Sequence, residues 1–389
     1  MRQLRVIAPG DGVFAELRAA LAGGDAILVA QESSTASAGP PPELSPGLPE
    51  SVEQRIALVV ETSGSTGRPK RVALSADAML ANAAGSESAL GGPGQWVLAL
   101  PTHYIAGLNV LARSLAAETV PVTVPRGHFT APGFLDAVDR MSHPTRFTSL
   151  VPAQLATLLD NPRASRVLAG FAAVLVGGQA APRTLIARAA DAGIRVRRSY
   201  GSSETSGGCV YDGVPIGSTT VRVVDGEVWL GGPSLAEGYL GDPELTAGRF
   251  VNEGGVRWFR TADGGELTSG PDGERLTVTG RRDDVLISGG VKVALAAVER
   301  VMRELPGFGD AVVVAVPDER WGEVPVAVVE GEDGDEAAAI ATVGAELGAA
   351  ARPARVIRID RIPLLTSGKA DRLAVRAIAL VSGDQGGSA

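Results

Sequence analysis

The sequence has little cysteine, little histidine and no long apolar run. One cysteine and three histidines occur among its 389 residues. This composition excludes an internal disulfide framework, fits a reducing cytoplasm and argues against a zinc site. No apolar run reaches the length of a membrane span, and the N-terminal residues lack the apolar stretch of a signal peptide. We therefore expect a cytoplasmic protein that does not insert into a membrane.

Basic residues are also outnumbered by acidic ones. The chain has 36 Lys and Arg residues against 44 Asp and Glu residues, which gives a net charge of -8. Because a nucleic-acid-binding protein needs a basic face, we expect no nucleic-acid partner. With 45% hydrophobic and 21% charged residues the chain resembles an ordinary globular protein, and its length suggests two or three domains. The sequence leaves the oligomeric state open, a homo-oligomer included.

Strand and helix patterns alternate over the first half of the chain. Apolar runs at 56–60 and 173–176 are typical of buried strands. Helices are expected at 75–90, 107–117, 132–141, 152–160 and 182–192. This alternation predicts an α/β fold of parallel βαβ sheets covered by helices. The Pro- and Ser-rich segment 31–50 is expected to be an irregular connector.

The pattern changes near residue 214. Short apolar stretches separated by Gly, Asp and Asn predict antiparallel hairpins or a small β-barrel. A compact α+β unit is expected after them, and it closes with the loop 363–369 and a last helix. We therefore predict an N-terminal domain of residues 1–282 and a C-terminal domain of residues 283–389.

A loop rich in glycine and hydroxyl groups follows the first of these strands, with the sequence Glu61-Thr-Ser-Gly-Ser-Thr-Gly-Arg-Pro-Lys70. Its glycines allow backbone N–H groups to approach an anion, and Lys70 adds a positive charge, so the loop can cradle a polyphosphate. The spacing is not that of a Walker A loop. An ordinary polar surface turn explains the segment equally well when it is taken alone.

Two further segments end strands with acidic residues. In Tyr200-Gly-Ser-Ser-Glu-Thr205 the tyrosine can stack on a purine and Glu204 can bind Mg²⁺ together with phosphate oxygens. In Trp258-Phe-Arg-Thr-Ala-Asp263 the final carboxylate can accept hydrogen bonds from ribose hydroxyls. The alternatives are a bend with a solvated glutamate and an aspartate that begins a turn.

Two segments lie at and beyond the predicted domain boundary. The stretch from Gly280 to Gly290 offers Arg281 for ribose or phosphate and Asp284 as a hinge. The loop Pro363-Leu-Leu-Thr-Ser-Gly-Lys369 presents a lysine that can stabilise charge on a carboxylate and an α-phosphate. Taken alone, the first is equally a solvated linker, and the second carries a surface lysine.

These segments, in this order over residues 56–380, resemble the adenylate-forming superfamily of acyl-CoA synthetases, luciferases and adenylation domains. The resemblance implies a large N-terminal domain of parallel βαβ sheets plus a small β-barrel, and a small mobile α+β C-terminal domain. It implies the use of ATP, Mg²⁺ and coenzyme A, with Glu204 as the metal ligand and Asp284 as the hinge. The implied catalytic residues are Thr62, Lys70, Glu204 and Lys369. The implied nucleotide-binding residues are Ser63, Gly64, Ser65, Thr66, Gly67, Lys70, Gly177, Gly178, Gln179, Tyr200, Gly201, Ser203, Asp263, Arg281 and Lys369.

Within that superfamily, three stretches look most like the o-succinylbenzoate–CoA ligases of menaquinone biosynthesis, of the short actinobacterial kind. They are 91–101, 103–107 and 206–215. The implied substrate is an aromatic carboxylic acid with a second carboxylate, and the candidate substrate-binding residues are His103, Gly178, Arg198, Ser202 and Ser206. Other aryl- or acyl-CoA ligases, an adenylation enzyme that loads a carrier protein, and a non-catalytic nucleotide-binding relative remain alternatives.

Overall fold

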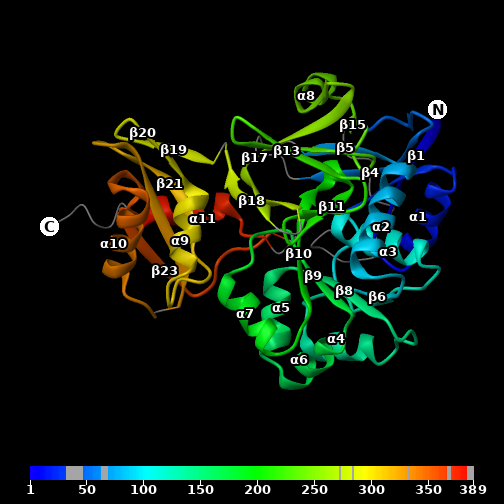
Figure 1. Cartoon of the computed structure of the whole chain (residues 1–389), viewed down its shortest axis with the longest axis horizontal. Helices are drawn as coiled ribbons and strands as arrows, with labels where there is room; N and C mark the ends of the chain where they lie inside the picture. The colour runs from blue at the N-terminus through cyan, green and yellow to red at the C-terminus, as the bar shows by residue number, and fades with distance from the viewer. Residues whose placement is uncertain are drawn as a thin grey trace.

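The computed structural model shows two lobes, one ending with strand β18 (Gly273–Arg281) and the other beginning with strand β19 (Val285–Ser288) (Figure 1). The residues that it describes are 1–31, 47–62, 69–270, 273–282, 284–331, 333–365 and 369–382. No helix within these ranges is long and apolar enough to cross a membrane. The division into domains at residue 282 stays a prediction.

The first sheet has six strands in the order β15-β5-β4-β2-β1-β3. In chain order they are β1 (Arg2–Ile7), β2 (Ala26–Val29), β3 (Ser51–Val52), β4 (Ile56–Thr62), β5 (Lys70–Ser75) and β15 (Gly238–Tyr239). The central strands β1, β2 and β4 are parallel, whereas β3, β5 and β15 pair antiparallel. The sequence reading missed β5, which places Lys70 opposite Thr62.

The second sheet has seven strands in the order β12-β11-β10-β9-β8-β6-β7. In chain order they are β6 (Gln95–Leu98), β7 (Val122–Thr123), β8 (Arg146–Leu150), β9 (Ala173–Val176), β10 (Val196–Ser202), β11 (Gly207–Tyr211) and β12 (Val214–Pro215). Strands β6 to β10 are parallel, and β11 and β12 extend the sheet antiparallel. The predicted parallel sheet is therefore real but is only one part of the lobe.

Continuous apolar strands are explained by burial on both faces. In β9, Ala173 and Leu175 pack in one core while Val174 and Val176 pack in another. Successive side chains of a strand point to opposite faces, so a strand buried on both sides has no polar positions. This is why the sequence showed runs rather than alternation at these strands.

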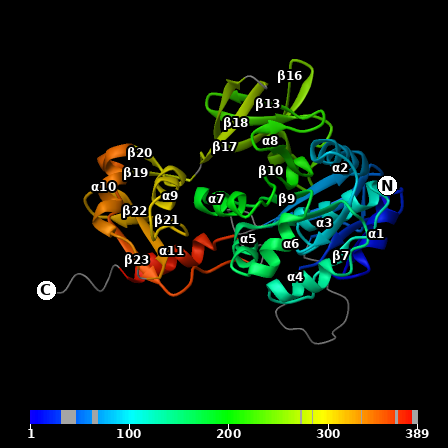
Figure 2. The ribbon, with the colours of Figure 1, turned by 60° about the horizontal axis from the view of Figure 1, so that its bottom comes forward.

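Helices fill the space between and beyond the two sheets. Helix α1 (Val13–Leu21), α2 (Ala76–Leu90) and α3 (Ile105–Ala116) contribute to a core that contains residues of both sheets. The second sheet's other core includes side chains from α4 (Ala131–Val138), α5 (Pro152–Leu159), α6 (Pro162–Ala169) and α7 (Arg183–Asp191). Figure 2 shows α4, α5 and α6 gathered on one side of this sheet, as in Figure 1.

Helix α6 was not predicted from the sequence. It begins after Asn161, whose side-chain oxygen accepts the N–H groups of Arg163 and Ala164, and Pro162 stands at its first position. Both features are typical helix starts. The helix has only eight residues and buries Ala164 and Leu168, so its apolar pattern is short.

A third, antiparallel sheet completes the large lobe. It comprises β13 (Thr220–Val224), β14 (Glu227–Gly231), β16 (Phe250–Glu253), β17 (Val256–Gly270) and β18, with helix α8 (Pro243–Arg249) ahead of β16. The long strand β17 pairs with β14, β16 and β18. This sheet carries the segment that ends at Asp263.

The small lobe is an α+β unit around one sheet in the order β20-β19-β22-β21, with β23 beside β22. Its remaining strands are β20 (Val291–Ala294), β21 (Val312–Asp318), β22 (Gly322–Glu330) and β23 (Arg355–Ile359). Its helices are α9 (Leu295–Arg303), α10 (Glu336–Leu347) and α11 (Arg372–Val381). Lys369 stands just before α11 and lies near Gly178 of the large lobe.

Candidate active site

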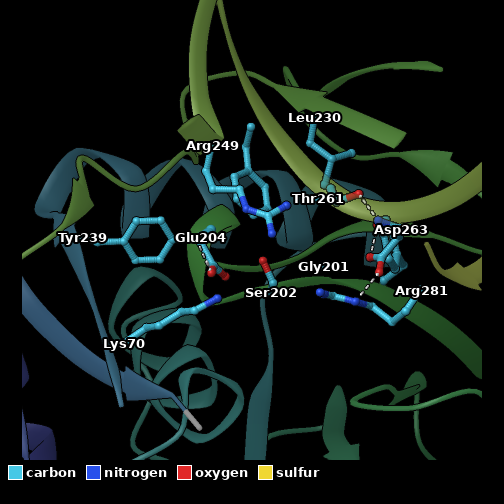
Figure 3. A pocket seen from close by; sticks show the side chains of 12 residues that line it. Lys70, Gly201, Ser202, Glu204, Leu230, Tyr239, Arg249, Thr261, Asp263 and Arg281 are labelled. Atoms are coloured by element: carbon cyan, nitrogen blue, oxygen red, sulfur yellow. Dashed lines mark hydrogen bonds and ion pairs between the residues drawn. The ribbon is translucent and has the colours of Figure 1, made fainter. Parts of the chain in front are cut away.

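A pocket of about 70 Å³ lies where the first, second and third sheets meet. Its lining residues are Lys70, Tyr200, Gly201, Ser202, Glu204, Leu230, Tyr239, Arg249, Phe259, Thr261, Asp263 and Arg281. The list includes residues from most of the motifs found in the sequence, although they are far apart in the chain. Figure 3 shows Lys70 and Arg281 pointing into the same space as Ser202.

The end of β10 shapes one wall of the pocket. The pairing of β10 with β11 shifts register between Tyr200 and Gly201. A Cβ atom at Gly201 would lie 2.2 Å from the Gly207 carbonyl oxygen, so only glycine fits here. The chain then turns into a short 3-10 helix that carries Glu204, whose Oε1 accepts the Tyr239 hydroxyl at 2.8 Å. Burial and the Glu204 charge raise the pKa of Tyr239, so the phenol stays neutral.

Asp263 forms the opposite wall. Its Oδ2 accepts the Tyr200 hydroxyl at 2.7 Å, and its Oδ1 lies 3.7 Å from Arg281 Nε (Figure 3). Arg281 is the direct cross-strand partner of Asp263, so the β17–β18 ladder sets this pair. Burial, and then Asp263, raise the pKa of Tyr200. The predicted purine-stacking and ribose-binding residues therefore touch each other.

Lys70 enters the pocket from the start of β5. It faces Thr62 across the β4–β5 pair, and the Thr62 hydroxyl donates to the Lys70 carbonyl at 3.5 Å. The predicted phosphate-binding residues between them lie outside the described residues; they are Ser63, Gly64, Ser65, Thr66 and Gly67. The strand pair fixes both ends of this loop beside the pocket.

Lys369 of the small lobe lies beside the pocket but is not among the residues that line it. Its charge interacts with those of Glu204, Asp263 and Arg281, and a Cβ built on Gly178 would lie 3.9 Å from its Cε. Burial among these groups lowers the pKa of the Lys369 ammonium, while the two carboxylates act in the opposite direction. By its accessible surface, however, Lys369 is an exposed residue, so solvent weakens this burial effect.

Other predicted residues lie near the pocket without lining it. Gly177, Gly178 and Gln179 form the loop after β9, and a Cβ on Gly177 would come within 3.0 Å of the Ser199 carbonyl oxygen. Ser203 is buried at 7% exposure in the 3-10 helix. The nucleotide-binding roles of these residues stay predictions.

The predicted acid-binding residues differ in whether they line the pocket. Ser202 lines the pocket, and its buried hydroxyl has no hydrogen-bond partner among the described residues. The buried Ser206 hydroxyl likewise has none there, although this residue does not line the pocket. His103 is buried with its ring 4.1 Å from that of Tyr104, and Arg198 instead pairs with Asp212.

The predicted hinge residue Asp284 stands just before β19. Its Oδ2 lies 3.4 Å from Arg372 Nη1, and its carbonyl accepts the Leu295 N–H at 3.0 Å. Arg372 also bonds to the buried Glu299 at 2.6 Å. The first turn of the helix that follows Lys369 is therefore tied to the start of the small lobe.

Arg113 is a buried charge that the sequence reading missed. It lies on α3, is 5% exposed, stacks on Trp96 at 5.1 Å and donates to the Tyr211 hydroxyl at 3.2 Å. No carboxylate lies within ion-pair distance among the described residues, and its Nε has no partner there. Glu87 lines a small cavity of about 10 Å³ with Arg113 but forms no ion pair with it. The signal available in the sequence was a lone arginine within an apolar helix.

The helix that carries Arg113 also contacts the segment that follows Glu204. Asn109 stands four residues earlier on the same face of α3, and its side-chain amide donates to the Ser206 carbonyl at 2.7 Å. The Tyr211 hydroxyl next to Arg113 also lies 2.9 Å from Ser86 Oγ. Burying a guanidinium without a counter-anion is costly, so this group suits an anionic ligand.

The pocket offers positioning and charge rather than a covalent nucleophile. Among the described residues, its lining includes cations, carboxylates and hydroxyls but no Cys or His. Burial raises the pKa of the Cys209 thiol to about 12, so it stays protonated. No group of three or more His, Cys, Asp or Glu residues that could hold a metal occurs in the described part of the chain. A metal held by one carboxylate and ligand phosphates still fits, because Mg²⁺ is commonly bound in this way.

Comparisons with known proteins show which proteins this chain resembles. The family model "AMP-binding enzyme" matches residues 15–240, and "AMP-binding enzyme C-terminal domain" matches residues 297–369. A "probable 2-succinylbenzoate–CoA ligase" of Mycobacterium tuberculosis is 42% identical over 333 residues, which cover 84% of this chain and 85% of that protein. A 2-succinylbenzoate–CoA ligase of Salmonella typhimurium is 37% identical, covering 71% of this chain and 58% of that protein.

Solved structures are similar as well. A variant of Escherichia coli MenE with bound OSB-AMS superposes with a TM-score of 0.68 at 29% identity, covering 92% of this chain and 74% of that one. The amide bond synthetase McbA of Marinactinospora thermotolerans gives a TM-score of 0.73 at 28% identity, covering 97% and 80%. These proteins share the fold of the whole chain, both lobes included.

Proposed function

Because the chain belongs to the AMP-binding enzyme family, we propose that it is an ATP-dependent acid–CoA ligase that activates 2-succinylbenzoate. The observation that carries the choice of acid is Arg113, a buried guanidinium without an ionic partner among the described residues. We propose that an acid with two carboxylates places one at the reacting centre and the other at this guanidinium. We call the pocket around Glu204 and Asp263 the nucleotide end of the site, and the surroundings of Arg113 the acid end.

In the first step, an oxygen of the reacting carboxylate attacks the α-phosphorus of ATP and pyrophosphate leaves. Asp263 would accept the ribose hydroxyls, and Tyr200 would pack against the purine. The Lys369 ammonium would stabilise the negative charge that develops between carboxylate and phosphate. Such a reaction depends on alignment and charge, which this pocket can supply.

Magnesium would be held by Glu204 together with ATP phosphates, and it would neutralise part of their charge. The Tyr239 hydroxyl, 2.8 Å from Glu204 Oε1, would orient this carboxylate. Lys70 lies in the same pocket and would add a second cation for the phosphates. These roles stay proposals.

In the second step, the coenzyme A thiol attacks the carbonyl carbon of the acyl-AMP, the thioester forms and AMP leaves. We propose that rotation near Asp284 withdraws Lys369 before this step. The ties from Asp284 and Glu299 to Arg372 would make the small lobe move as one body with its lysine loop.

The proposal is tested with purified protein, ATP, Mg²⁺ and three acids. These are 2-succinylbenzoate and the two analogues that each lack one of its carboxylates. We expect pyrophosphate release with 2-succinylbenzoate, followed by thioester and AMP when coenzyme A is added. Each analogue should be used about 30-fold less efficiently or worse, because a buried charge is left unpaired or the reacting group is missing.

The same assay separates the alternatives. Pyrophosphate release without thioester would favour an enzyme that loads a carrier protein. Equal use of 2-succinylbenzoate and the analogue that keeps the reacting carboxylate would favour another aryl- or acyl-CoA ligase. No release with any aromatic acid would favour a non-catalytic nucleotide-binding relative.

A further inference from the structure

Glu227 is a buried carboxylate beside the nucleotide end that does not line the pocket itself. It begins β14 and is 5% exposed. Its Oε1 accepts the Ala262 N–H at 3.0 Å, and its Oε2 accepts Arg260 Nη2 at 3.1 Å and Trp229 Nε1 at 3.2 Å. Burial acts to raise the pKa of Glu227, but these hydrogen bonds outweigh it and hold the pKa below its ordinary value. The side chain is therefore ionised at neutral pH.

The residue that Glu227 holds has an unusual backbone conformation. Ala262 has a φ of 61°, in the left-handed region that residues with a Cβ rarely adopt. Its N–H is bonded to Glu227, and its carbonyl accepts the Arg282 N–H at 2.9 Å. A disfavoured conformation persists only where its surroundings fix it, and these two bonds fix the Ala262 residue from both sides.

The conformation of Ala262 decides where the next side chain points. Thr261 Oγ1 accepts the Asp263 N–H at 3.0 Å and donates to the carbonyl of Val228 on β14 at 2.7 Å. With the backbone turned in this way, the Asp263 carboxylate faces Tyr200 and the pocket (Figure 3). If Ala262 adopted an ordinary extended conformation, the Asp263 carboxylate would point in a different direction.

We propose that Glu227 is a positioning residue for nucleotide binding: it holds Ala262 in the left-handed conformation and thereby aims Asp263 into the pocket. The inference rests on the proposed function only for the identity of the ligand, a nucleotide with free ribose hydroxyls. Glu227 touches no reacting atom, so its effect acts through Asp263.

If Glu227 had only a structural role, its loss would have a different effect. Glu227 also neutralises Arg260, and Arg282 Nη1 lies 3.9 Å from its Oε2, so its loss leaves cations unbalanced in the sheet. That effect does not depend on the residue at position 262. A positioning role does depend on it, because glycine adopts the left-handed conformation without a penalty and needs no clamp.

The test compares Glu227→Gln in two backgrounds, with alanine or glycine at position 262. The amide oxygen of the new glutamine is drawn to Arg260 and Trp229, which leaves its NH₂ group against the Ala262 N–H. We measure the dissociation constant for AMP by titration calorimetry, and KM for ATP and kcat in the pyrophosphate assay. Glu253→Gln serves as the matched control, because Glu253 pairs with Arg222 in the same sheet without touching Ala262.

We expect Glu227→Gln to weaken AMP binding about tenfold in the alanine background and less than about threefold in the glycine background. KM for ATP should rise with little change in kcat, and Glu253→Gln should leave both constants unchanged. Equal losses in the two backgrounds, or no loss in either, would overturn the positioning role and leave the proposed function intact. A wild-type protein that binds no AMP would overturn both.

A second variant covers the case in which Glu227→Gln does not fold. Glu227→Asp keeps the charge that balances Arg260 but is one methylene too short to reach the Ala262 N–H in the same way. The same dependence on the residue at position 262 is expected for AMP binding. Independence from that residue would count against the proposal here too.

Discussion

The two proposed ends of the site differ in how their polar groups are paired. At the nucleotide end, Asp263 bonds to Tyr200 and Glu204 bonds to Tyr239 within the protein itself. At the acid end, the Arg113 guanidinium has a neutral hydroxyl and an aromatic ring as neighbours but no ion-pair partner among the described residues. The proposed nucleotide end is thus prearranged by internal contacts, whereas at the proposed acid end no anion among the described residues balances the charge of Arg113.

The largest effect is expected from the loss of Lys369, the residue that the small lobe contributes to the nucleotide end. Lys369→Ala should lower the rate of pyrophosphate release by about 10²- to 10³-fold, because it removes one preorganised donor of transition-state charge stabilisation. Conversion of supplied acyl-AMP and coenzyme A to thioester should be retained, because the lysine is proposed to act in the first step alone. Both half-reactions are measured separately by pyrophosphate and thioester assays.

The control for this change is Lys292→Ala, which removes an exposed lysine of the same lobe. It should leave pyrophosphate release unchanged. An equal loss of both half-reactions in Lys369→Ala would contradict the assignment, since it would indicate general damage rather than a missing charge in one step.

A smaller effect is expected at the acid end. Arg113→Met keeps a long apolar side chain beside Trp96 but removes the charge, so KM for 2-succinylbenzoate should rise about 30-fold or more. KM for ATP should stay unchanged because the nucleotide end is not touched. The free energy of unfolding should stay the same or rise, because a buried unbalanced charge has been replaced by an apolar group. Steady-state kinetics and thermal unfolding measure these quantities.

Two companion variants sharpen the result. Arg188→Met, at an exposed arginine of α7, should change neither KM. Glu87→Gln should not destabilise the protein if Arg113 awaits a substrate carboxylate. A loss of stability in both Arg113→Met and Glu87→Gln would identify Glu87 as the long-range partner of the arginine, and the acid end would then be a structural cluster.

The same contrast explains how much could be predicted from the sequence. Family membership and the α/β fold class are confirmed by the comparisons. The residues gathered at the nucleotide end, such as Glu204 and Asp263, stand in short motifs, where local order alone carries information. Glu204 follows the end of β10, but the expectation that a strand ends at Asp263 was wrong, because Asp263 lies within the long strand β17. Arg113 could not be found in this way. Its neighbours Ser86 and Tyr211 come from other elements, and only the packing of α2, α3 and β11 brings them together.

Backbone geometry was equally hidden from the sequence. Nothing in the letters Thr-Ala-Asp indicates that Ala262 adopts a positive φ or that Glu227 holds it. A prediction from residue types would have put glycine at such a position. Strain of this kind depends on the sheet around it, so it appears once the strands are placed.

The smallest expected effect concerns the pH dependence of the nucleotide end. Burial disfavours the charged form of Lys369 and lowers its pKa from the ordinary 10.5. The rate of pyrophosphate release should therefore fall on the alkaline side at a lower pH than an ordinary lysine would give. The pocket phenols do not produce this fall, because burial and neighbouring carboxylates raise the pKa of Tyr200 and Tyr239. Lys369→Arg should move the fall to higher pH, since a guanidinium keeps its proton, and Lys292→Arg should not move it. If the wild type, Lys369→Arg and Lys292→Arg all lost activity at the same alkaline pH, another group would be titrating. The charge of Lys369 would then not contribute to the difference between the two ends.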